Sequence, residues 1–93
     1  ALISGPTPDA ALARALVAAA LVGDTQLAQR LQTALGDDAP REVAASLAEL
    51  AGRQGRLQLA TASTAIAELA RRGVIDLAKL RAAAAGTPAA NAL

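Results

Sequence analysis

The stretch LVGDTQLAQRLQTALGDDAP, residues 21–40, carries the helix-breaking signals that organise the chain. Gly23 supplies a left-handed end to one helix, and Asp24 is a favoured cap for the next. Leucines at helical spacing then oppose glutamines and an arginine, which is the pattern of an amphipathic helix. Gly36 ends that helix, and Pro40 favours the first turn of another. The stretch therefore predicts the end of one helix, the whole of a second and the start of a third.

Similar signals outside this stretch predict the remaining helices. Thr7-Pro8-Asp9 indicates a helix that starts at residue 8 and runs to residue 22. GRQGR, residues 52–56, predicts a turn between the third helix and a fourth that ends before Gly73. Asp76 caps a short fifth helix, and no segment alternates as a strand would. We expect an all-α fold of about five helices, with sequential helices as antiparallel neighbours.

The chain is expected to form a single helical domain, because 93 residues leave no room for a second core. The expected parts are an N-terminal extension over 1–7, a helical hairpin over 8–36, a second hairpin over 40–73, a capping helix over 76–85 and a flexible tail over 86–93.

The apolar content is high, but most of it is alanine. Of the 93 residues, 28 are Ala, whereas Leu, Val and Ile number 15, 4 and 3, and there is no aromatic residue, Met or Cys. An alanine has one methyl to bury, while a buried Leu, Val or Ile side chain gains about 1.5–3 kcal/mol. The core is therefore thin for the chain length, and we expect a partner to supply further burial.

The composition argues against catalysis and against cofactor or metal binding. The chain has neither His nor Cys, so the usual triads and soft-metal sites are excluded. Helix capping accounts for Asp37 and Asp38 without a catalytic role, and Lys79 is expected to be a solvated surface residue. The net charge of +1 favours neither nucleic acid nor a membrane surface, and the longest apolar run, residues 15–22, is too short for a bilayer span of about 20 residues. The absence of cysteine suggests the cytoplasm.

The two glycine turns indicate an internal repeat, because Gly23 and Gly55 lie 32 residues apart and each precedes an alanine by five residues. The pattern resembles the tetratricopeptide repeat, whose unit is about 34 residues. The matching residues are Leu12, Gly23, Ala28, Leu35 and Pro40 in the first unit and Leu47, Gly55, Ala60 and Ala67 in the second. Gln32 and Thr64 stand where that family usually has an aromatic residue, and Arg72 where it has proline. An unrelated alanine-rich bundle with similar hairpins is the alternative.

The resemblance implies a non-catalytic protein-binding module, such as a small chaperone or adaptor of the kind that serves type III secretion. In that family the first helix of each hairpin lines a groove for a partner's helix or extended peptide. The residues expected to face the groove are Ala13, Val17, Ala20, Leu21, Glu42, Ala45, Glu49 and Arg53. A charged residue at Val17 or Leu21 should then abolish partner capture and leave the helices intact.

Two other functions remain open. In the first, the chain is a dimerisation or docking domain of a larger protein, and the first helix packs against its copy. In the second, less favoured, residues 61–75 are similar to the recognition helix of a winged helix-turn-helix protein. In that helix, the residues expected to contact the DNA groove are Thr61, Ser63 and Thr64. The residues expected to contact phosphates are Arg71 and Arg72. The segment that follows reads as a helix, whereas a wing is a β-hairpin.

Overall fold

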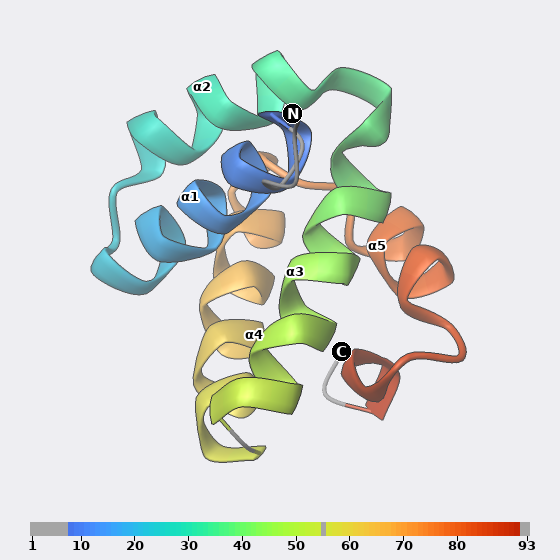
Figure 1. Cartoon of the computed structure of the whole chain (residues 1–93). Coiled ribbons are helices and arrows are strands. Elements are labelled where there is room, and N and C mark those ends of the chain that lie inside the picture. The colour runs from blue at the N-terminus through green and yellow to red at the C-terminus, as the bar shows by residue number, and fades with distance from the viewer. Residues whose placement is uncertain (1–7, 55, 92–93) are drawn as a thin grey trace, which may run out of the picture.

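The computed structural model describes residues 8–54 and 56–91, which are helical with short connections and contain no strand (Figure 1). The predicted all-α class is confirmed. There are four helices of 11 to 16 residues and a shorter one of 8 residues. In chain order the elements are α1 (Pro8–Val22), α2 (Thr25–Leu35), the 3₁₀ turn η1 (Gly36–Asp38), α3 (Ala39–Gln54), α4 (Arg56–Arg71), α5 (Leu77–Ala84) and the 3₁₀ turn η2 (Pro88–Asn91).

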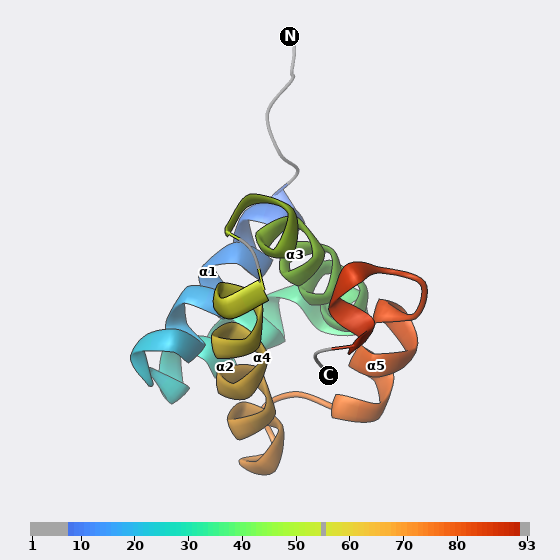
Figure 2. The ribbon, with the colours of Figure 1, turned by 90° about the horizontal axis from the view of Figure 1, so that it is seen from below.

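Two helices organise the packing of the others. α1 packs against α2, α3 and α4, and α3 packs against α1, α4 and α5. Consequently α2 covers α1 on one side of the molecule and α5 covers α3 on the other, as the two views show (Figures 1 and 2). Because α1 touches three other helices, much of its apolar circumference is buried.

The turn between α1 and α2 has the structure that its sequence predicts. Gly23 adopts a φ of 78°, a conformation that disfavours residues with a side chain. The backbone N–H of Leu27 donates to Asp24 Oδ1 at 3.1 Å, so Asp24 caps α2. Asp76 caps α5 in the same way through the N–H of Lys79. These short-range contacts fix where both helices start.

Replacing Asp24 by Ala should lower the free energy of unfolding by about 1 kcal/mol, because the N–H of Leu27 then loses its acceptor. Asp24→Asn retains an acceptor oxygen and should change the free energy of unfolding by only about 0.3 kcal/mol. Urea unfolding followed by circular dichroism at 222 nm measures both variants. Equal losses for Ala and Asn would show that the hydrogen bond does not account for the effect.

The core lies where α1, α3 and α4 meet and extends beneath α5. Its largest fully buried side chains are few, and they come from four helices: Leu16, Val43, Leu47, Ile66 and Leu80. Alanines without any exposed surface fill the spaces between helices: Ala13, Ala28, Ala62 and Ala84. The interior is thus built largely from residues that allow helices to approach closely.

Two segments differ from the sequence-based expectation. The predicted turn at residues 52–56 is shorter, because α3 continues through Gly52 to Gln54 and α4 already begins at Arg56. A glycine inside a helix costs only about 1 kcal/mol, and the packing of α3 against the neighbouring helices can offset this cost. Gly55 and the side chains of residues 53, 54, 56 and 57 lie outside the described part of the chain.

The segment after Gly86 is expected from the sequence to be a flexible tail, but in the structure it packs against the helices. η2 packs against α3 and α5, and Ala89 has no exposed surface. Thr87 organises the turn: its Oγ1 donates to the carbonyl oxygen of Ala84 at 2.6 Å and accepts from the N–H of Ala89 at 3.2 Å. This packed segment extends to residue 91, and residues 92–93, like the expected extension over 1–7, lie outside the described residues.

Candidate functional site

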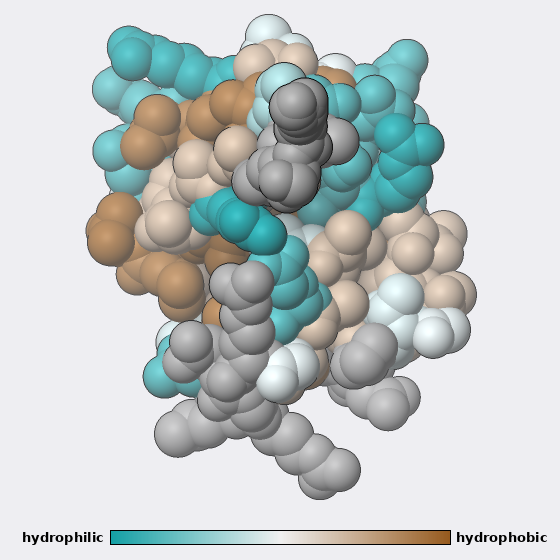
Figure 3. Space-filling model, viewed as in Figure 1, coloured by the Kyte–Doolittle hydropathy of each residue, from teal (hydrophilic) through white to brown (hydrophobic). Residues whose placement is uncertain are grey.

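The exposed large apolar side chains of the described residues gather at one place, the corner between α1 and α2. Leu21, Val22 and Leu27 expose 45%, 79% and 40% of their surface, and we call them the apolar corner. Brown surface marks this edge of the molecule on the left of Figure 3. Arg72 Nη1 donates to Thr25 Oγ1 at 2.7 Å and so holds the start of α2 to the end of α4. The corner therefore lies beside the end of α4 as well as between α1 and α2.

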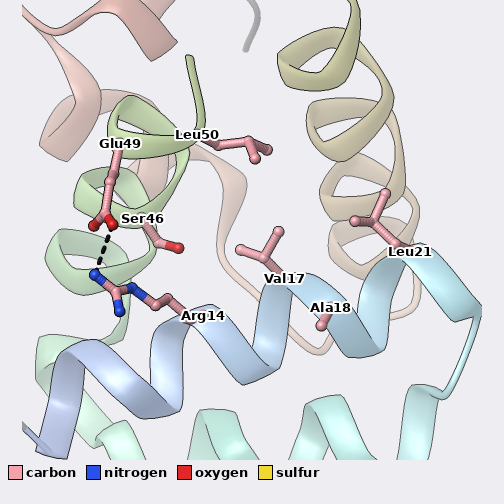
Figure 4. A pocket seen from close by; sticks show the side chains of 7 residues that line it. All are labelled: Arg14, Val17, Ala18, Leu21, Ser46, Glu49 and Leu50. Atoms are coloured by element: carbon pink, nitrogen blue, oxygen red, sulfur yellow. Dashed lines mark hydrogen bonds and ion pairs between the residues drawn. The ribbon is translucent and has the colours of Figure 1, made fainter. Parts of the chain in front are cut away.

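A shallow depression adjoins this corner, in the angle between α1 and α3 (Figure 4). Its volume is about 240 Å³. Val17 on α1 and Leu50 on α3 approach each other at its centre, and Leu21 borders it on the side of α4. The lining of this α1–α3 depression consists of Arg14, Val17, Ala18, Leu21, Ser46, Glu49 and Leu50. Leu21 belongs to both features, so the depression and the corner form one continuous surface.

An ion pair closes the depression at the end away from the corner. Arg14 Nη2 lies 2.6 Å from Glu49 Oε1, and both side chains are partly exposed. Exposed pairs of this kind contribute about 0.2–1 kcal/mol to stability. The Arg14–Glu49 pair matters more for the shape of the site, because it joins α1 to α3 and places two opposite charges at one end of the depression.

Of the predicted groove residues, the structure brings Val17, Leu21 and Glu49 together in the depression. Ala13 and Ala20 are buried in the core instead, so their assignment to an open groove is wrong. The reason is that α1 packs against α2, α3 and α4, and the face that carries these two alanines points into the junction.

Glu42 and Ala45, which are predicted groove residues with described side chains, lie on α3 and do not line the depression. Ala45 is exposed and Glu42 is half-buried, and the side chain of Arg53 is outside the described part of the structure. Sequence reasoning missed Arg14, Ala18, Ser46 and Leu50. Arg14 offered a signal, since it is the one charged residue of α1 after the first turn and marks the exposed side.

No protein-family model, curated protein or solved structure matches the chain. The tetratricopeptide-like stack thus stays a prediction beside the unrelated bundle. In the structure the two hairpins, α1–α2 and α3–α4, meet through α1, which packs against both helices of the second hairpin.

The residues proposed for DNA contact do not form one exposed set. Ser63 is only 3% exposed, so its hydroxyl lies inside the core. Thr64 is exposed, but its Oγ1 donates to the carbonyl oxygen of Ala60 within α4 at 2.9 Å. α5 follows where a winged domain would have a β-hairpin.

Of the described helices, none is long and apolar enough to cross a membrane.

Proposed function

We propose that the protein is a non-catalytic protein-binding module whose docking face consists of the apolar corner and the α1–α3 depression. The observation that carries the proposal is the gathering of Leu21, Val22 and Leu27, the exposed large apolar side chains of the described region, beside an apolar depression. Exposed apolar surface that is contiguous in this way is typical of interaction sites, whereas scattered apolar residues are not.

The charges on the docking face support a protein partner. Arg14 and Glu49 are the charged residues that line the depression, and they pair with each other. The depression therefore offers no net charge to a phosphate backbone or an anionic lipid surface, and burial of apolar side chains is the main source of affinity of the docking face.

Within this class we propose a small chaperone or adaptor. A partner that covers the docking face adds burial that an alanine-rich core lacks, and it binds only the folded chain, so it also stabilises the fold. The cytoplasmic location suggested by the absence of cysteine stays a prediction.

Self-association is the second candidate, because Val22 is 79% exposed and a second copy could cover it as well as a partner. In a symmetric dimer the same face would be buried on both subunits. Stoichiometry separates the two functions, since a dimer has already filled the face that a partner needs.

Replacing Val22 by Lys should weaken the binding of Nile red, an uncharged hydrophobic dye, about twofold, because a charge at the corner keeps the face hydrated. Lys is chosen because a cation is favourable at the C-terminal end of α1. Light scattering should give the monomer mass of 9.2 kDa, and circular dichroism should show unchanged helicity. Ala82→Lys, at an exposed position in the last turn of α5, is the matched control.

Two results would contradict the proposal. Unchanged dye binding in Val22→Lys would mean that the corner is not an accessible apolar site. A dimer that persists at low micromolar concentration and dissociates in Val22→Lys would assign the face to self-association.

A further inference from the structure

Building on the proposed function, we infer that the docking face binds one short amphipathic helix of a partner protein, with a bulky apolar side chain seated in the α1–α3 depression. Three properties of the surface lead to this occupant: the size of the depression, the area of the face and the all-helical backbone around it.

The depression has the size of a site for one side chain. Its volume of about 240 Å³ lies below the roughly 300–1,000 Å³ of pockets that enclose a small-molecule ligand. Val17 and Leu50 form an apolar floor, and the Arg14–Glu49 pair limits it on one side. An aromatic or long aliphatic residue can enter from the open side next to Ala18.

The area of the face argues against a second copy. The docking face, which is the corner together with the lining of the depression, comprises nine residues. A stable complex buries about 800 Å² and roughly 20–30 residues on each partner. The face falls well short of that size, but a few anchoring side chains of a short segment can supply most of a binding energy.

The backbone around the face favours a helix over an extended peptide. One way in which an extended peptide gains affinity is by adding a strand to a sheet edge, and the described residues contain no strand. The backbone N–H and C=O groups of an extended chain that face the apolar surface would also lose water without gaining partners. A helix satisfies these groups internally, and the exposed Ala18, which ends in a single methyl group, lets it lie close to α1.

The test uses a synthetic peptide of about 15 residues with Leu at helical spacing on one face and a single Trp among them. The protein has no Trp, so a fluorescence change reports only on the peptide. The expected result is saturable binding with a blue shift of the Trp emission. A peptide of the same composition, with its apolar residues distributed around the helix, should bind at least about tenfold more weakly.

Filling the depression provides the decisive variant. Ala18→Phe should weaken binding of the amphipathic peptide at least about fivefold, whereas Ala82→Phe on α5 should leave it unchanged. Both positions are exposed, so neither substitution disturbs the core, and circular dichroism checks this directly.

Each other outcome overturns the inference in a recognisable way. If Ala18→Phe has no effect while Val22→Lys abolishes binding, the corner is a docking face but the depression does not seat an anchor. Equal affinity for both peptides, or saturable binding of neither, excludes an amphipathic helix as occupant. In these cases the proposed function is judged separately by the dye and light-scattering results for Val22→Lys.

Discussion

Leu47→Ala should lower the free energy of unfolding by about 2–5 kcal/mol, the range for removing a fully buried leucine side chain. Leu47 has no exposed surface and lies on α3, against which α1, α4 and α5 all pack. Domains of this kind have total stabilities of about 5–15 kcal/mol. With few large side chains in the core, neighbouring residues cannot move in to fill the space. The variant should therefore unfold partly at physiological temperature.

Urea unfolding monitored at 222 nm is the suitable measurement, because the chain has no Trp or Tyr to report by fluorescence. Leu27→Ala is the matched control, since Leu27 is 40% exposed and should cost about 1 kcal/mol or less. Similar losses for the two variants would show that the core is not centred on α3.

Val17→Asp should destabilise the protein by about 3–5 kcal/mol, whereas Leu21→Asp should leave it folded. Both residues line the depression, but Val17 is 6% exposed and Leu21 is 45% exposed. Asp has too short a side chain to carry its carboxylate out to water, and an uncompensated buried charge is strongly destabilising. At position 21 the carboxylate stays hydrated, and an anion near the end of a helix costs about 1 kcal/mol at most.

This predicted contrast differs from the expectation from sequence that a charge at either position leaves the helices intact, because Val17 is buried and Leu21 is exposed. Thermal unfolding followed by circular dichroism distinguishes the two variants, and the amphipathic peptide then tests binding by Leu21→Asp. A folded Val17→Asp variant would mean that the depression admits water down to its floor. Peptide binding by Leu21→Asp at the affinity of the unchanged protein would remove Leu21 from the docking face.

The boundary between α1 and α2 could be predicted because its signals are local. Gly23 and Asp24 act through a backbone angle and a hydrogen bond within four residues, and neither depends on the rest of the fold. Ala89 is the opposite case. Its burial depends on contact with α3, more than thirty residues earlier in the chain, and nothing in an Ala-rich tail indicates that contact.

The candidate site was predicted only in part, for a related reason. Ala13 and Ala18 are chemically identical positions on the same helix, yet the first is wholly buried and the second is exposed. A helix that is apolar around its whole circumference does not specify which side faces the core. Which side stays open is decided by the helices that pack against α1, and the sequence of α1 does not contain that information.

The alanines without exposed surface, among them Ala13, Ala28, Ala62 and Ala84, also affect what folding requires of the side chains. A buried leucine or isoleucine gives up about 0.5–1 kcal/mol of rotamer freedom, and a methionine up to about 2 kcal/mol, whereas alanine has no rotamers to lose. The parts of the interior that these alanines fill are thus ordered as soon as the backbone is ordered. Modest hydrophobic burial can then suffice to hold the helices together.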